Sequence, residues 1–259
     1  MTSSLLVMCL ALALTAGLCY VLRSGGARRV DQEHTCVRAT NTLPPWDSWA
    51  RLAQEALASE PAVLPEHLLL VRDLAGNLAR RFDPPAGVIP RQAAVLLLLY
   101  PDVGDLRLPL TVRSDQLPSH RGEVSLPGGA IDPADDGPIS AALREAHEEL
   151  GVPPDAVKIW GTLSPLYISP SNFRITPVVG MIDPVPTLRP NAAEVSAVIT
   201  VTVRELLDPA LVMQEQWTLH GAEVRVPFFA IAGHKVWGAT AIVLSEFVAR
   251  MRRVQAHNT

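Results

Sequence analysis

The sequence predicts an α/β protein, a mixed sheet sandwiched between helices in an α/β/α arrangement, preceded by a helical segment and an N-terminal transmembrane helix. Three observations lead to this prediction. Apolar and alternating segments typical of strands recur between residues 91 and 231. Helical patterns stand among these strands and after the last of them, which suits helices on both faces of a sheet. An uncharged apolar run at residues 5–22, LLVMCLALALTAGLCYVL, is about as long as a bilayer-spanning helix.

Residues 1–24 are predicted to form a membrane anchor, with residues 5–22 as the span. Arg23, Arg28 and Arg29 follow directly and would keep the rest of the chain in the cytoplasm by the positive-inside rule. A cleaved signal peptide and a start codon assigned too far upstream are the alternatives. With the anchor, we expect the protein on the cytoplasmic face of a membrane; without it, we expect a cytoplasmic protein.

A linker and a helical extension are expected between the anchor and the catalytic domain. Residues 25–45 are polar and irregular, as in a linker, and residues 46–88 form the predicted extension. Residues 48–59 have helical periodicity with Ser48 as the N-cap, and residues 64–82 predict a second helix that ends before two prolines.

The catalytic domain is expected over residues 89–259. Strands are predicted at residues 91–101, 106–114, 157–163, 173–182 and 223–231, and residues 194–206 predict a strand that turns into a short helix. Residues 164–173, rich in proline and serine, are expected to form a loop beside the pocket, and residues 238–253 a closing amphipathic helix.

The segment at residues 126–152, LPGGAIDPADDGPISAALREAHEELGV, predicts a glycine turn followed by an acidic helix. On a helix of 3.6 residues per turn, one face is apolar: Ile139, Ala142, Leu143, Ala146 and Leu150. Glu145, Glu148 and Glu149 gather on the opposite face, where like charges three and four residues apart repel by about 0.3 kcal/mol per pair. Such a helix beside a glycine pair is suited to holding Mg²⁺ or Mn²⁺, which prefer oxygen ligands. A solvated acidic face is the alternative.

Composition restricts the partners of this domain. A net charge of −4 over 259 residues argues against a general nucleic-acid binder, and a polyanionic small-molecule substrate would need a local cluster of arginines. Cys9, Cys19 and Cys36 all precede the domain, which leaves it without a disulfide framework or a thiol nucleophile. The sequence leaves the oligomeric state open.

The acidic helix and its glycine pair resemble a known motif. REAHEELGV, preceded by GG, is similar to the Nudix box of hydrolases that cleave nucleoside diphosphates linked to another group. The upstream stretch PLTVRSDQLPSHRGEVSLPGG resembles the coenzyme A diphosphatase subgroup. The matching positions are Leu110, Thr111, Arg113, Ser114, Gly122, Pro127, Gly128 and Gly129. Pro118 stands where this subgroup usually carries arginine, a charge that His120 or Arg121 could supply, and Leu126 replaces a phenylalanine.

The resemblance implies a metal-dependent enzyme of the Nudix α/β/α fold. It would hydrolyse the diphosphate bond of coenzyme A or acyl-CoA to 3′,5′-ADP and (acyl-)4′-phosphopantetheine, with Mg²⁺ or Mn²⁺ as cofactor. One alternative is hydrolysis of another nucleoside diphosphate derivative, such as ADP-ribose. Another is a nucleotide-binding module without turnover, but the chain keeps all three glutamates of the box, which favours the enzyme.

Each candidate residue has a predicted role. Glu145 and Glu149 are the predicted metal ligands, and Glu148 shares ligation or acts in catalysis by orienting water. Arg144 is assigned to the catalytic machinery, where it would pair with Asp136 or Glu148 and hold the loop to the helix.

The substrate-binding set is expected to be Arg113, Ser114, Gly128 and Gly129. The Arg113 guanidinium suits a phosphate, and the glycines allow close approach of the backbone. The general base stays open between Glu145 and Glu148. Glu194 is a third candidate, and an exposed loop residue without a catalytic role is the favoured alternative for it.

Overall fold

The fold is built around β2 (Arg91–Asp102), which a computed structural model places in the middle of a mixed sheet. The structure describes residues 46–59, 65–115 and 122–258. The predicted anchor and linker, and Pro118, His120 and Arg121, lie outside these residues. In the part of the chain that is described, no helix is long and apolar enough to cross a membrane.

The leucine run of β2 is buried on both faces of the sheet. Leu97 and Leu99 point to one face and Leu96 and Leu98 to the other, because successive side chains of a strand alternate. A strand covered on both faces is apolar at every position, which is why the sequence predicts it so clearly.

The sheet is mixed, as predicted. Its order is β4-β3-β2-β8-β6, with β5 also paired to β2, β7 to β8 and β9 to β3. β2 runs parallel to β8, and the other pairs are antiparallel. The bounds of the strands beside β2 are β3 (Asp105–Arg113), β4 (Val124–Ser125), β5 (Gly128–Ala130), β6 (Lys158–Thr162), β7 (Leu166–Ile168), β8 (Phe173–Met181) and β9 (Val195–Thr202).

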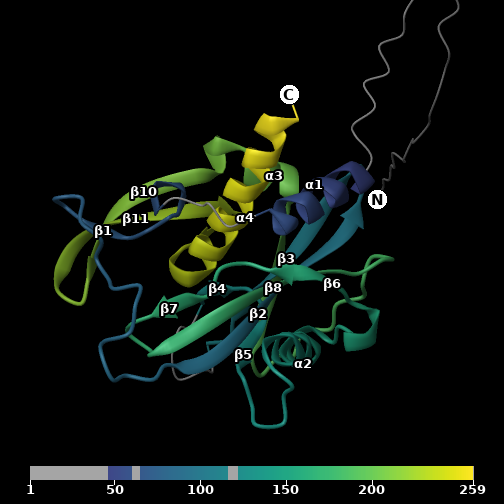
Figure 1. Cartoon of the computed structure of the whole chain (residues 1–259), viewed down its shortest axis with the longest axis horizontal. Helices are drawn as coiled ribbons and strands as arrows, with labels where there is room; N and C mark the ends of the chain where they lie inside the picture. Colours follow the sequence, from purple (N-terminus) through teal and green to yellow (C-terminus); the bar gives the residue numbers. More distant parts are fainter. Residues whose placement is uncertain (1–45, 60–64, 116–121, 259) are drawn as a thin grey trace, which may run out of the picture. The chain divides into compact units, whose positions relative to one another are not determined.

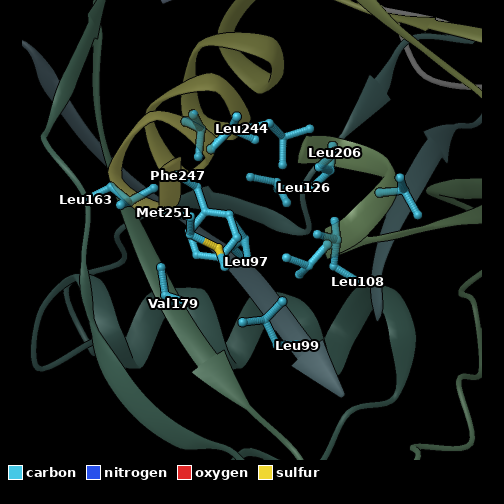
Figure 2. Close-up of a cluster of buried hydrophobic side chains, with 14 of the residues drawn as sticks. Leu97, Leu99, Leu108, Leu126, Leu163, Val179, Leu206, Leu244, Phe247 and Met251 are labelled. Carbon is cyan, nitrogen blue, oxygen red and sulfur yellow. The ribbon is translucent and has the colours of Figure 1, made fainter. Parts of the chain in front are cut away.

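Helices cover both faces of this sheet, which confirms the sandwich (Figure 1). α2 (Pro138–Leu150) packs on the face of Leu96 and Leu98. α4 (Gly238–His257) lies on the opposite face, where Phe247 and Met251 meet Leu97 and Leu99 (Figure 2). The remaining helical segments are α1 (Trp46–Ala58), α3 (Val203–Leu207), η1 (Pro65–His67), η2 (Pro154–Ala156) and η3 (Pro209–Leu211).

A second, smaller sheet joins β1 (Arg72–Asp73) and β10 (Val212–Leu219) to the edges of β11 (Ala222–Ile231), and β12 (His234–Val236) also pairs with β11. β11 confirms the strand predicted at residues 223–231. The ring of Trp217 meets that of Trp237 edge-on, with centroids 5.1 Å apart. Since α1 packs against α4 and β1 pairs with β11, the described residues before Arg91 share the core of the sheets.

Three local predictions are wrong. The helix expected at residues 64–82 is instead a turn of 3₁₀ helix, the short β1 and a tight turn in which Gly76 has a φ of +93°. Pairing of β1 with β11 and the break at Gly76 override the helical pattern. Ser48 is not an N-cap, because α1 begins at Trp46. The loop expected at residues 164–173 contains β7, which pairs with β8.

Candidate active site

The glycine pair brings the main chain of β5 against the glutamates of α2. Gly128 is paired with Val95 of β2, and a Cβ at Gly128 would overlap the backbone there. A Cβ at Gly129 would overlap the carboxylate of Glu145, and the Gly128 N–H donates a hydrogen bond to the carboxylate of Glu149. The absence of a Cβ thus allows Gly128 to lie against the backbone of β2, whereas a Cβ at Gly129 would displace the Glu145 carboxylate.

The helix that carries the glutamates is set between two glycines. Gly137 precedes Pro138 at the first helical position, and Gly151 ends the helix in the left-handed conformation. Its buried side chains are Ala141, Ala142, Ala146, Glu149 and Leu150. The predicted apolar face is therefore right in part. Ile139 is exposed instead of buried, and Leu143 is half-buried.

The three glutamates, predicted to gather on the face opposite the apolar one, are in different surroundings, and a solvated acidic face does not describe Glu149. Glu149 is only 4% exposed, whereas the side chain of Glu148 is 50% exposed and that of Glu145 15%. Position 149 lies one turn beyond Ala146 and two beyond Ala142, so it borders the buried side of the helix.

Burial dominates the ionisation of Glu149. Desolvation raises the pKa of Glu149 to about 7, and the charges of Glu145 and Glu194 act in the same direction. The Gly128 N–H and the charge of Arg113 oppose this rise. Desolvation also raises the pKa of Glu145.

One carboxylate oxygen of Glu149, Oε2, is buried with no hydrogen-bond partner. Buried polar atoms in proteins are almost always paired, so such an atom requires an explanation. The explanation would be a bound cation, because an oxygen that serves as its ligand gains the cation as a partner in place of a hydrogen-bond donor. The donor set around it, carboxylates beside glycine main chain, also fits a hard divalent cation.

Arg144 ties the loop after the glycine pair to the helix. Its Nε and Nη2 donate to Asp135 at 3.2 and 3.0 Å, and Nη2 also donates to the Ala130 carbonyl at 3.0 Å. Nη1 donates to Glu145 at 2.8 Å and to Glu148 at 3.1 Å. The predicted bond to Glu148 is confirmed, but the acid in the loop is Asp135.

Asp136, the loop acid that the sequence suggested as a partner of Arg144, is exposed. Adjacent acids in a turn point in different directions, and the turn places the side chain of Asp135 where it also accepts from the Asp132 N–H at 2.8 Å. In the part of the chain that is described, no group of three or more His, Cys, Asp or Glu side chains is drawn together as a finished metal site.

Arg113 is the last residue of β3, and Ser114 follows it. Arg113 lies near enough for its charge to lower the pKa of Glu149, and its Nε is buried with no hydrogen-bond partner. Ser114 is buried, and its N–H donates to the carbonyl of Glu194 at 2.8 Å. The charges of Arg113 and Glu194 thus act on Glu149, whereas Ser114 is joined to the main chain of Glu194.

Asn191 lies between Glu194 and α2 and is absent from the candidates that the sequence provides. Its side-chain amide donates to Glu194 at 3.2 Å. The only local signal for it is an asparagine three residues before a glutamate, a spacing that suits a side-chain turn in any loop.

Carboxylates of a helix that lie against glycine main chain form an arrangement suited to a divalent cation and the phosphates it binds. The NUDIX domain model matches residues 90–220, and this chain belongs to the Nudix family. It is an enzyme of that family, whose members act on pyrophosphate bonds and generally use divalent metal ions.

Several curated relatives are similar to this chain. An uncharacterized Nudix hydrolase NudL of Photorhabdus laumondii is 36% identical over 188 residues, which cover 71% of this chain and 100% of the relative. The mitochondrial coenzyme A diphosphatase NUDT8 of Homo sapiens is 39% identical over 189 residues, covering 70% of this chain and 75% of the relative. An uncharacterized NudL of Escherichia coli is 39% identical over 163 residues, covering 62% and 83%.

Proposed function

We propose that this enzyme hydrolyses the diphosphate bond of coenzyme A or acyl-CoA to 3′,5′-ADP and (acyl-)4′-phosphopantetheine. The observation that carries the reaction type is the buried Glu149 carboxylate, with an unpartnered oxygen beside the glycine pair. Support for the substrate comes from the coenzyme A diphosphatase among the relatives and from the TVRS and GEVSLPGG segments of this chain.

Glu145, Glu149 and Glu148 would hold Mg²⁺ or Mn²⁺. Such an ion neutralises the charge of a diphosphate and acidifies a water molecule. The buried Oε2 of Glu149 is the best ligand, because an apolar environment strengthens its attraction for a cation. Glu145 adjoins it one helical turn away, and the half-exposed Glu148 has the access to solvent that orienting a water molecule requires.

Arg113 and the glycine pair would bind the substrate phosphates. The buried Nε of Arg113 lacks a partner and can donate to a phosphate oxygen. Ser114 follows it on the same strand end, and the Gly128–Gly129 main chain leaves no side chain between the backbone and a phosphate. Arg144 holds the loop, Glu145 and Glu148 in place, so we assign it to the organisation of the site.

A substrate panel tests this proposal. Full-length protein is incubated with CoA, an acyl-CoA and ADP-ribose, in Mg²⁺ or in Mn²⁺, and the products are separated by chromatography. We expect 3′,5′-ADP from CoA and none from the Glu149→Gln variant. Cleavage of ADP-ribose but not of CoA would show that the substrate is wrong. Binding of nucleotide without hydrolysis in either metal would identify a binding module.

A further inference from the structure

β10 forms an outer edge of the small sheet and has a strand partner on one side only (Figure 1). It pairs with β11 over its whole length, from Val212 to Leu219, without a bulge. Within the part of the chain that the structure describes, the main chain of β10 makes no hydrogen bond to any segment other than β11. Every second residue of an edge strand points its N–H and C=O groups outward, so β10 exposes a row of unpaired donors and acceptors.

The features that usually prevent an edge strand from pairing with another chain are missing from β10. Natural edge strands are protected by proline, by lysine, by a bulge or by a covering segment. The sequence of β10, VMQEQWTL, contains neither proline nor lysine. Its one charged residue, Glu215, is neutralised by Lys235, whose Nζ lies 2.6 Å from the carboxylate. The edge is therefore open to a further strand and carries no net charge that would repel one.

A second copy of β10 is a strand that could fill this edge, and symmetry restricts how it would pair. Two-fold dimers are the commonest homo-oligomers, and two edge strands related by a two-fold axis run antiparallel. The axis is then perpendicular to the sheet, so each residue lies opposite a residue that points to the same face. It follows that the axis passes through a residue position and not between two residues.

The charge of Glu215 selects between two positions of this axis. An axis at Glu215 would pair residues 212–218 of the two copies, and an axis at Gln216 would pair residues 213–219, the longest overlaps that the strand allows. The first places the Glu215 carboxylate opposite its own copy, and like charges in directly opposed positions destabilise a sheet. The second avoids that contact, so the register centred on Gln216 is favoured.

The side chains also match in the register centred on Gln216. Met213, which is 51% exposed, lies opposite Leu219 of the second copy, so each would cover the other's apolar surface. Glu215 lies opposite Trp217 of the second copy. An indole N–H is a suitable donor to this carboxylate, because Trp217 already donates to Glu215 within one chain at 2.9 Å. Apolar residues thus oppose apolar residues, and the carboxylate opposes a donor.

We propose that the open edge of β10 is a dimerisation surface, at which two copies of this chain join their small sheets in antiparallel register about Gln216. Main-chain hydrogen bonds between the two β10 strands supply the attraction, and the opposed side chains select the register. The surface belongs to the small sheet, whereas α2 with its glutamates packs on the central sheet. The inference therefore does not depend on the substrate of the enzyme.

Disulfide trapping in the full-length protein tests both the dimer and its register. Cys9, Cys19 and Cys36 are first replaced by serine, which removes all natural thiols. In the proposed dimer the two copies of position 216 are directly opposed. Their Cα atoms then lie about 4.5–5.5 Å apart, within the range that a disulfide spans. We expect Gln216→Cys to form a covalent dimer under mild oxidation, seen on a non-reducing gel. Light scattering of the wild-type protein should give twice the mass of one chain.

Gln214→Cys provides a matched control, because Gln214 is an exposed glutamine on the same strand and the same face as Gln216. The two copies of position 214 would lie four residues apart along the paired strands, about 13 Å, too far for a disulfide. Position 214 lies instead opposite Thr218 of the second copy. The double variant Gln214→Cys with Thr218→Cys should therefore form the covalent dimer that Gln214→Cys alone does not.

Three results would overturn the inference. The first is wild-type protein with the mass of one chain and no covalent dimer of Gln216→Cys, which would leave the edge free or for another partner. The second is a dimeric protein in which Gln216→Cys forms no disulfide, because the copies would then join through another surface. The third is equal trapping of Gln214→Cys and Gln216→Cys, the result of random collisions. Both side chains are exposed, so the circular dichroism spectra of the variants should match that of the wild type.

Discussion

Replacing Glu149 by glutamine removes a buried charge and keeps the shape of the side chain and an acceptor for the Gly128 N–H. The raised pKa of Glu149 means that the folded state binds this proton more tightly than the unfolded state does. The stability contributed by this carboxyl is therefore complete below its unfolded pKa and is lost as the pH rises through about 7. A rise from 4.5 to about 7 corresponds to about 3 kcal/mol at full ionisation.

Chemical denaturation without divalent metal measures this effect. We expect the free energy of unfolding of Glu149→Gln, relative to wild type, to increase by roughly 2 kcal/mol between pH 5 and pH 8. The same variant should be inactive, so stability is gained as function is lost. Glu148→Gln is the comparison variant, because it removes a carboxyl from the same helix that is half-exposed rather than buried. A difference between Glu149→Gln and wild type that is equal at the two pH values would refute the reasoning.

Three further changes have defined outcomes. Gly129→Ala puts a methyl group into the space of the Glu145 carboxylate, and we expect kcat to fall at least about tenfold with an unchanged circular dichroism spectrum. Arg144→Lys cannot reproduce the forked contact to the loop and should lower the free energy of unfolding by about 1–3 kcal/mol in urea. Arg250→Met leaves the buried Glu246 without its partner at 2.6 Å, and a loss of about 3–5 kcal/mol is expected from the shift of the denaturation midpoint.

The strands of the central sheet could be predicted because buried strands consist mainly of apolar residues, which the sequence shows directly. β2 and the second half of β8 are buried, and their apolar runs have the length of strands rather than of helices. β10 was missed because it has no buried side chain and its sequence, VMQEQWTL, contains no clear alternation. Residues 64–82 carry a helical pattern, but their hydrogen bonds form with β11 and within a turn, and such long-range pairing leaves no local signal.

The site was predictable in kind but not in detail. The glutamates and glycines lie in one contiguous stretch, and the whole pattern, with its resemblance to the Nudix box, favours a cation site over a solvated acidic face. The burial of Glu149 depends on how closely β5 approaches α2, and the choice of Asp135 over Asp136 depends on the path of the loop. Asn191 enters the site from a segment about forty residues after the box helix, so only the tertiary fold reveals it.

The order in which the two faces of β2 are covered has a consequence for biosynthesis. β2, α2 and β8 lie within residues 91–181, so the face of Leu96 and Leu98 can close while the ribosome is still translating later codons. The face of Leu97 and Leu99 needs Phe247 and Met251, which come from α4. Until those residues emerge, a nascent chain presents a broad apolar surface, the kind that chaperones bind. A ribosome that stalls before residue 238 would therefore leave a formed catalytic helix on a half-covered sheet.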